Sequence, residues 1–172
     1  MALSCKNGVC IAGKRLSRKK LNALIPKHDK FIEAFAGNAW VYRECLKTGN
    51  CSDNAVLNDI NCKTTSHLKK EFGSRYQCGH DYKKIIEKHD GKNSFFFLDP
   101  PYPNACKSGY YGKYCDLDHD ELLKVIKKIK GKFMLTTSTD QRPKFCKDFK
   151  CKIITTSGMY GRKLKDLVIK NY

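Results

Sequence analysis

The segment Asp99-Pro100-Pro101-Tyr102 combines residue types that are well suited to chemistry on an aromatic amine. It directly follows the continuous apolar run 94–98, which predicts a strand buried on both faces. The Asp99 carboxylate and the carbonyl of Pro100, whose φ is fixed, could each accept one N–H of an amino group such as that of adenine. The nitrogen lone pair could then attack an activated methyl group while Tyr102 stacks on the extruded base. The alternative is an ordinary Asp-Pro turn at the end of a strand.

Two earlier segments have the features of a ligand-binding turn and of a diol-binding carboxylate. In Phe35-Ala36-Gly37-Asn38-Ala39, small residues follow an apolar run and let the backbone approach a ligand at a helix N-terminus. Asp59 ends a second apolar run about twenty residues later, where a carboxylate can bind the two hydroxyls of a ribose. A helix cap or an Asx turn is the alternative for Asp59, and Asp81 could also simply cap its helix.

The rest of the chain alternates short apolar runs with amphipathic segments, which is typical of an α/β protein with a mostly parallel sheet. Ligands of such sheets lie at the carboxyl ends of the strands, near the point where the strand order reverses. This rule places Asp59 and Asp99, each at a strand end, where a ligand would bind. The last strand returns from the turn at 158–163 and is therefore expected to be antiparallel. The predicted strands are 31–35, 55–57, 75–78, 94–98, 133–137, 153–156 and 166–169, and the predicted helices are 16–25, 40–47, 61–72, 81–89, 118–129 and 140–149.

These segments, taken in order along residues 12–172, resemble the motifs of the Dam-type (D12 class) DNA N6-adenine methyltransferases. Asp-Pro-Pro-Tyr after an aromatic strand resembles the family's catalytic motif, and 35–39 resembles its first motif. Several motifs in the same order are far more specific than any one of them. The further matching segments are Ala12-Gly13-Lys14, Leu24-Ile25-Pro26-Lys27-His28 leading into Phe31-Ile32-Glu33-Ala34-Phe35, Asn58-Asp59-Ile60-Asn61, Asp81-Tyr82, and Asp166 to Tyr172.

The resemblance implies one catalytic domain over residues 1–172, with the Rossmann-like fold of class I S-adenosylmethionine-dependent methyltransferases. That fold is a mostly parallel twisted sheet with helices on both faces and an antiparallel C-terminal hairpin. The implied reaction transfers a methyl group from S-adenosyl-L-methionine to N6 of adenine in DNA by in-line displacement, without a metal. The implied catalytic residues are Asp99, Pro100, Pro101 and Tyr102, and the implied cofactor-binding residues are Ala12, Gly13, Lys14, Glu33, Phe35, Gly37, Asp59, Ile60, Asp81 and Tyr82.

The sequence also departs from the family's pattern. Ala12 and Ala39 replace glycines, and Cys10 stands where a Trp is frequent. Family members usually carry a target-recognition insertion, but here the third motif fills the 40 positions between Asp59 and Asp99. A protein partner or a homodimer could therefore supply target recognition. Two alternatives to DNA methylation stay open: N6-adenine methylation of RNA, and a catalytically degenerate subunit that only binds nucleic acid.

The formal net charge of +17 indicates a polyanionic partner, most simply a nucleic acid. The basic segment near the N-terminus suits contacts to phosphate, and the loop 103–117 interleaves lysines with tyrosines that could stack on nucleotides. Their alternatives are a solvated helix face and a surface loop whose tyrosines pack on the body. The candidate nucleic-acid-binding residues are Lys14, Arg15, Arg18, Lys19, Lys107, Tyr110, Tyr111 and Lys113.

The ten cysteines contain no C-x-x-C pair and no histidine at ligand spacing, so the sequence implies no metal site. We expect free thiols in a reducing cytoplasm, where buried cysteines behave as small hydrophobic residues. Neither an apolar run long enough to span a membrane nor a secretory signal is evident, so an intracellular location without membrane attachment is expected.

Overall fold

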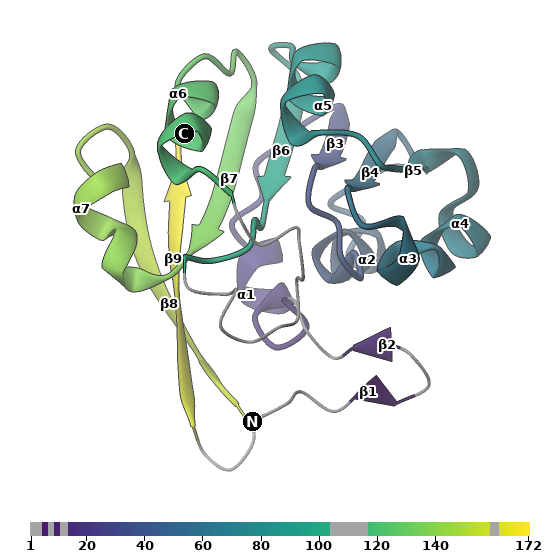
Figure 1. Ribbon diagram of the computed structural model, residues 1–172, viewed down its shortest axis with the longest axis horizontal. Coiled ribbons are helices and arrows are strands. Elements are labelled where there is room, and N and C mark those ends of the chain that lie inside the picture. Colours follow the sequence, from purple (N-terminus) through teal and green to yellow (C-terminus); the bar gives the residue numbers. More distant parts are fainter. Residues whose placement is uncertain (1–4, 7–8, 11–13, 104–116, 159–161) are drawn as a thin grey trace.

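A seven-stranded sheet dominates the computed structural model, which describes residues 5–6, 9–10, 14–103, 117–158 and 162–172 (Figure 1). Its strands in sequence order are β3 (Lys30–Glu33), β4 (Ala55–Asp59), β5 (Tyr76–Cys78), β6 (Ser94–Leu98), β7 (Lys132–Thr137), β8 (Lys150–Ser157) and β9 (Lys163–Lys170). The short strands β1 (Cys5–Lys6) and β2 (Val9–Cys10) form a separate antiparallel pair.

The spatial order of the sheet is β5-β4-β3-β6-β7-β9-β8. Strands β3 to β7 are parallel to one another, whereas β9 runs antiparallel to both β7 and β8. Successive strands first extend the sheet to one side of β3 and then, from β6 onward, to the other side. The strand order therefore reverses at β3 and β6. The predicted mostly parallel α/β sheet with an antiparallel C-terminal hairpin is confirmed.

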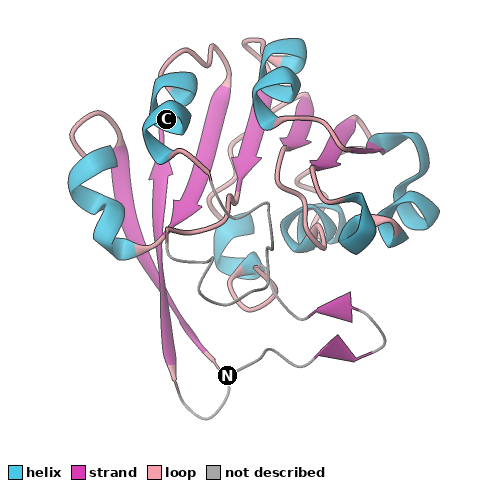
Figure 2. Cartoon of the chain, viewed as in Figure 1, coloured by secondary structure: helices cyan, strands magenta, loops and turns pink. Residues whose placement is uncertain are grey.

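Helices cover both faces of this sheet (Figure 2). One core cluster joins α1, α2 and α4 to the sheet, and a second joins α5, α6 and α7 to the other face. Strand β6 shows why both faces must be covered: Phe95 and Phe97 belong to the first cluster, while Phe96 and Leu98 belong to the second. The helix bounds are α1 (Arg18–Asn22), α2 (Trp40–Lys47), α3 (Cys62–Thr65), α4 (His67–Phe72), α5 (Tyr82–His89), α6 (His119–Ile126) and α7 (Arg142–Phe145), with short 3₁₀ turns η1 (Gly73–Arg75) and η4 (Thr139–Gln141).

Three of the predicted helices are markedly shorter or more broken than their sequence pattern suggested. The last of them, 140–149, is an α-helix only over α7, with the 3₁₀ turn η4 before it. The first predicted helix is regular only over α1, with turns on either side. The predicted helix 61–72 is split into α3 and α4 at Ser66, and Asn61 occupies the N-cap position without a side-chain capping bond. Instead, the backbone N–H of Asn61 donates to the Asp59 carboxylate, so the helix start is tied to the end of β4.

The prediction of free thiols is wrong for the six cysteines whose side chains the structure describes. They form the disulfides Cys45–Cys51, Cys62–Cys78 and Cys146–Cys151. The paired cysteines are 6, 16 and 5 positions apart, and these spacings do not reveal the pairs because the local backbone geometry decides whether two Cα atoms come close enough for a disulfide. The reducing compartment inferred from free thiols loses this support. Among the described residues, no helix is long and apolar enough to cross a membrane.

Replacing Phe96 by alanine is expected to destabilise the fold by about 3–5 kcal/mol, because the fully buried ring on the central strand leaves a cavity. Chemical unfolding monitored by circular dichroism measures the change. Leu164→Ala, at a side chain 40% exposed on β9, is the control and should change stability by less than about 0.5 kcal/mol. Equal losses for the two variants would contradict the assignment of β6 to the centre of the core.

Candidate functional site

Three acidic residues meet at the carboxyl edge of the parallel strands. Glu33 ends β3, Asp59 ends β4 and Asp99 directly follows β6. Because β3 lies between β4 and β6 in the sheet, parallel pairing brings these three strand ends side by side. Burial raises the pKa of the Glu33 carboxyl well above its usual range, and the nearby charges of Asp99 and Asp59 raise it further. The three acids are therefore close enough for their charges to interact.

Asp59 connects the glycine-containing turn after β3 to the end of β4. Its Oδ2 accepts the backbone N–H of Gly37 at 2.9 Å, and its Oδ1 accepts that of Asn61 at 2.9 Å. The bond to Asn61 is the Asx turn considered as an alternative from the sequence. Burial raises the pKa of Asp59, while these two backbone bonds lower it. Each oxygen retains acceptor capacity, so the turn does not preclude a ribose at this carboxylate.

The backbone of the turn after β3 has an uncommon geometry. Gly37 has φ +50°, and a Cβ placed on it would meet no atom within 4 Å, so the space beside it is open. Ala39 has φ 52°, the left-handed region that a non-glycine residue rarely adopts. Alanine thus holds the conformation for which the resembled family uses glycine.

Phe35 and Tyr82 form an aromatic pair beside this turn, with ring centroids 5.2 Å apart. Tyr82 is the first residue of α5, and Asp81 caps that helix by accepting the backbone N–H of Lys83 at 2.7 Å. Burial raises the pKa of the Tyr82 hydroxyl, so the group stays protonated. Asp81 therefore has the capping role that its sequence position allowed. Ile60, directly after Asp59, is 41% exposed.

Buried polar atoms without a hydrogen-bond partner gather at this same edge. Among the described residues, such atoms are rare because each one costs roughly 1–3 kcal/mol. At the carboxyl edge they include one oxygen of Glu33 and the hydroxyl of Tyr82. A polar ligand bound here would supply their missing partners. The other buried unpartnered atoms at this edge are Trp40 Nε1, Asn58 Oδ1, Thr137 Oγ1 and Ser138 Oγ.

Asp99 lies in a cluster of charged and polar groups drawn from distant parts of the chain. Its Oδ1 lies 2.7 Å from Lys14 Nζ and accepts the hydroxyl of Thr136 at 2.7 Å. Thr136 belongs to β7, the strand next to β6, whereas Lys14 comes from the N-terminal region. The side chains of Lys14 and Asp99 are only 10% and 15% exposed. Both contacts reach the same oxygen, which fixes the orientation of the carboxylate.

Tyr102 is tied into this cluster by its hydroxyl. The hydroxyl donates to Asp166 Oδ1 at 2.7 Å and accepts a short hydrogen bond from Lys14. The Lys14 ammonium lies 4.5 Å from the centroid of the tyrosine ring, a cation–π contact. Burial, together with the carboxylates of Asp99 and Asp166, raises the pKa of Tyr102 well above its usual range. Pro101, in the same segment, contacts His119. The Pro101 carbonyl oxygen lies 3.1 Å from the ring Nε2 of His119.

The candidate nucleic-acid-binding residues are only partly described. Arg18 forms an ion pair with Glu44, with Nε to Oε2 at 3.0 Å, so its charge is largely compensated. The guanidinium of Arg15 lies 5.5 Å from the Trp40 ring centroid, and Lys19 is exposed. Lys14 faces Asp99 rather than the surface. Ala12, Gly13, Lys107, Tyr110, Tyr111 and Lys113 lie outside the described residues.

Sequence reasoning missed Thr136, Asn58 and Asp166 as members of this site. Thr136 and Asn58 are polar residues near the ends of apolar strands, a signal that the sequence does contain. Asn58 Nδ2 donates to the carbonyls of Ala34 and His80, which links three segments around the turn after β3. Asp166 lies near the start of β9, and only the antiparallel orientation of that strand brings it to the edge where the parallel strands end.

No protein-family model and no curated protein matches this sequence. Solved structures do match the fold. An Escherichia coli protein provisionally named a methyltransferase superposes with a TM-score of 0.59 at 14% identity, covering 98% of this chain and 91% of its own. A Pyrococcus horikoshii protein provisionally named an RNA methyltransferase superposes with a TM-score of 0.58 at 12% identity, and the match covers 99% of this chain and 90% of that protein. TrmK of M. capricolum, solved with S-adenosyl-homocysteine, superposes with a TM-score of 0.55 at 10% identity, and the match covers 90% of this chain and 66% of TrmK.

Identities this low establish the architecture alone. This chain has the fold of the class I S-adenosylmethionine-dependent methyltransferases.

Glu33→Gln is expected to change how stability depends on pH. The pKa of Glu33 is raised in the folded state above its ordinary value of 4.5, so its contribution to stability is present below pH 4.5 and is lost as the pH rises through the raised pKa. Glutamine carries no titrating proton, so the variant should gain stability relative to wild type as the pH increases from 4.5. Urea unfolding at a series of pH values without ligand measures this difference. Glu87→Gln, at an exposed residue of α5, is the control, and parallel curves for wild type and Glu33→Gln would refute the buried, titrating carboxyl.

Proposed function

We propose that this protein transfers a methyl group from S-adenosyl-L-methionine to N6 of adenine in DNA, as a small relative of the Dam-type methyltransferases. The observation that carries the proposal is the position of Asp99-Pro100-Pro101-Tyr102. This segment directly follows the buried strand β6 and lies beside a second set of acids, Glu33 and Asp59, at the strand-order reversal of a methyltransferase fold.

The residues around the turn after β3 fit the cofactor. Asp59 lies at the end of β4 and suits the ribose hydroxyls of the cofactor. The Phe35–Tyr82 pair offers aromatic surface to the adenine of the cofactor. The unpartnered oxygen of Glu33 accepts a donor of the bound molecule, and Gly37 leaves open space for it. The cofactor, once bound, supplies an electrophilic methyl group.

Asp99 positions the amine that receives this methyl group. Lys14 and Thr136 hold Oδ1 of the carboxylate, so Oδ2 accepts one N–H of the adenine amino group, and the Pro100 carbonyl accepts the other. The nitrogen lone pair is then directed at the methyl group. As the new C–N bond forms and the S–C bond breaks, the amine loses one proton, and Asp99 is placed to receive it. Most of the rate enhancement comes from this alignment, which can supply roughly 7–11 kcal/mol.

Tyr102 offers its ring to the extruded base. The ammonium of Lys14 lies 4.5 Å from the centroid of that ring and donates to the hydroxyl, so it lies toward the hydroxyl end of the ring. A base can therefore stack on the ring carbons while the Lys14–Asp99 ion pair stays intact. The bond from the hydroxyl to Asp166 keeps the ring in place. We assign Asp166 and Thr136 as positioning residues of the proposed reaction.

A polyanion is the proposed partner because the formal net charge is +17. The β8–β9 hairpin extends past the carboxyl end of β7, whose last paired residue, Thr137, is opposite Leu167 (Figure 1). Its projecting end carries exposed Arg162, Lys163 and Lys165 on the side where the candidate site lies. Together with Arg15 and Lys19 these cations can contact phosphates. The proposal includes a cytoplasmic location, where nucleic acid and cofactor are both present, and a second protein or a second copy that supplies target recognition.

RNA is the second candidate substrate, because one of the similar folds carries the provisional name of an RNA methyltransferase. Incubation with methyl-labelled cofactor and duplex DNA, single-stranded DNA or RNA, followed by nucleoside mass spectrometry, distinguishes the two. Label in N6-methyladenosine from RNA alone would replace DNA by RNA in the proposal. Absence of label from every nucleic acid, with the cofactor still bound, would favour a binding subunit.

Asp99→Asn should lower the rate of methyl transfer by a factor of at least about 100, because the variant lacks the carboxylate that accepts and orients the amine. Its affinity for the cofactor should remain within about twofold of wild type, since Asp99 faces the amine. Single-turnover transfer and calorimetric titration measure the two quantities. Asp148→Asn, which removes a partly exposed carboxylate paired with Lys127, serves as the matched control and should retain full activity. Near wild-type transfer by Asp99→Asn would remove Asp99 from the mechanism.

Asp59→Asn should have the opposite effect to Asp99→Asn: it should weaken cofactor binding and leave the rate of methyl transfer nearly unchanged. Replacing the charged acceptor of the ribose hydroxyls is expected to weaken cofactor binding roughly 10-fold to 100-fold, as for the loss of a charge-assisted hydrogen bond. The rate of transfer at saturating cofactor should change little. Titration calorimetry with S-adenosyl-L-methionine and with S-adenosyl-homocysteine gives the affinities, and urea unfolding verifies that the turn at Gly37 survives. Unchanged affinity would leave Asp59 with the Asx turn as its only role.

A further inference from the structure

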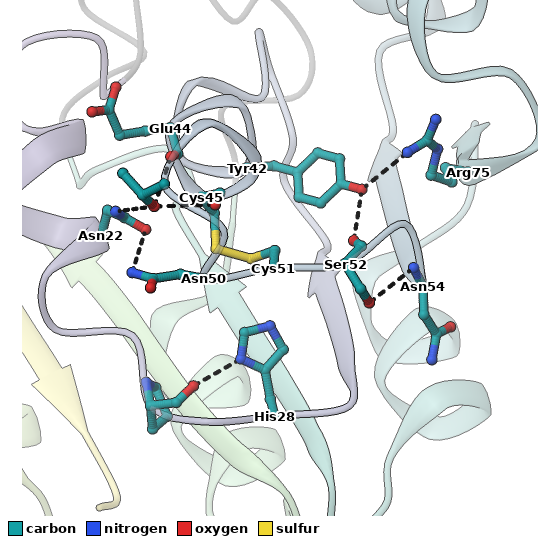
Figure 3. Close-up of a disulfide and its surroundings, with 12 residues drawn as sticks. Asn22, His28, Tyr42, Glu44, Cys45, Asn50, Cys51, Ser52, Asn54 and Arg75 are labelled. Carbon is teal, nitrogen blue, oxygen red and sulfur yellow. Dashed lines mark hydrogen bonds between the residues drawn. A yellow bond between two sulfur atoms is a disulfide. The ribbon is translucent and has the colours of Figure 1, made fainter.

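A histidine and two cysteines converge at the opposite, amino-terminal edge of the sheet (Figure 3). His28 precedes β3, Cys45 lies in α2, and Cys51 lies between α2 and β4. One ligand atom from each residue, a ring nitrogen and two sulfurs, lies within 4.8 Å of the other two. Within the described part of the chain, His28, Cys45 and Cys51 form the group of potential metal ligands, and their spacing in the sequence did not reveal it.

The ring of His28 presents a free lone pair to this group. Its Nδ1 lies 2.8 Å from the carbonyl oxygen of Pro26, which can only accept, so Nδ1 carries the hydrogen. In the neutral ring, Nε2 then has a lone pair, and within the described residues this buried atom has no hydrogen-bond partner. Metal-binding histidines have this arrangement, in which one nitrogen donates to a backbone carbonyl and the other binds the ion. An unpartnered buried acceptor beside two sulfurs is therefore independent support for a ligand.

The two cysteines are held close by more than their disulfide. Helix α2 ends at Lys47 with Thr48 as its C-cap, and the next residue, Gly49, has φ +73°. The backbone N–H of Asn50 donates to the carbonyl of Cys45 at 3.0 Å. Gly49 N–H donates to Leu46, which completes a Schellman motif. These bonds keep the chain reversal between Cys45 and Cys51 closed when the sulfurs separate.

Side-chain hydrogen bonds reinforce the same turn. Asn22 donates to the Thr48 hydroxyl at 2.8 Å, and that hydroxyl lies 3.1 Å from the carbonyl of Cys45 (Figure 3). Cys45 is fully buried, whereas Cys51 is partly exposed. A small reductant and an ion can thus reach the pair from the Cys51 side, and a water molecule can complete a fourth coordination position there.

We propose that His28, Cys45 and Cys51 form a zinc site when the Cys45–Cys51 disulfide is reduced. A dithiol reductant supplies two electrons and two protons, so the S–S bond breaks, two thiols form, and the reductant becomes a disulfide. Binding of Zn²⁺ then releases the two thiol protons, while His28 releases none because Nε2 is already unprotonated. Two thiolates, one imidazole and a water give the tetrahedral coordination that zinc prefers.

The oxidised and reduced pairs are thus alternative states of one site. Disulfide sulfurs are poor ligands, so the oxidised chain does not hold the ion, and zinc protects the reduced pair from reoxidation. The site lies at the amino end of β3, away from the carboxylates at its other end, so the ion stabilises the packing of α2 against the sheet and takes no part in methyl transfer. In a reducing compartment the zinc form predominates.

The test compares zinc binding by the whole chain before and after reduction. The protein is reduced anaerobically with a phosphine, exchanged into buffer with Zn²⁺ and desalted, and bound metal is measured by atomic emission. We expect the reduced chain to bind at least one more zinc ion than the oxidised chain. The electronic spectrum with Co²⁺ should show sulfur-to-cobalt charge transfer and the intense d–d bands of tetrahedral coordination. No gain of metal on reduction of the wild type would overturn the proposal without any variant.

Variants assign the metal to this site. His28→Gln, which keeps a polar side chain of similar reach, and Cys51→Ser should each lose one equivalent of zinc. The double variant Cys146→Ser/Cys151→Ser is the matched control, because it removes another short-range disulfide, beside which the described part of the chain places no group of potential metal ligands with a histidine. It should retain the full gain of zinc. Circular dichroism verifies that each variant folds. Equal zinc in wild type and His28→Gln would place the metal on other cysteines and refute the site.

Discussion

The carboxyl edge of the sheet has to accommodate three carboxyl groups that parallel pairing places side by side. Water would stabilise their charges, but the adjoining helices and loops largely exclude it, so each acid needs another form of compensation. Asp59 receives two backbone N–H groups and Asp99 receives an ammonium and a hydroxyl. Glu33 accepts the backbone N–H of Tyr42 and lies near the charge of Arg43, but burial and the charges of Asp99 and Asp59 outweigh both, so its pKa stays raised. The surroundings of the proposed active site follow from these three solutions to one electrostatic problem.

The compensation of Asp99 also joins the two ends of the chain. Lys14 lies near the N-terminus and Asp166 lies in the last strand, yet both meet Tyr102 beside the central strand β6. Because β9 is inserted antiparallel between β7 and β8, its first half extends past the sheet and its acidic residue lies where the parallel strands end. In the proposed reaction, an incoming base would enter a cluster whose groups are already paired. Its binding would then compete with the existing contacts, which favours a ligand whose own hydrogen bonds replace those it displaces.

The two edges of the sheet differ in the chemistry that they can support. The carboxyl edge presents oxygen acids and unpartnered polar atoms, which suit a polar organic ligand. The amino edge presents sulfur and imidazole nitrogen, which suit a soft or borderline metal ion. Strand β3 connects the two, since His28 precedes it and Glu33 ends it. This separation permits a metal-dependent contribution to stability with no metal in the proposed reaction.

The sequence by itself determined the α/β class and the approximate strand positions, and it predicted that Asp99 and Asp59 lie at strand ends, because hydrophobic periodicity and the residues at strand ends are local properties. It did not determine the partners of those residues. The contacts of Lys14 and Asp166 with Tyr102, the disulfides, and the approach of His28 to Cys45 and Cys51 join positions whose separation in sequence carries no pattern. Only the tertiary structure decided them, because the order and direction of strands in the sheet fix which distant side chains share an edge.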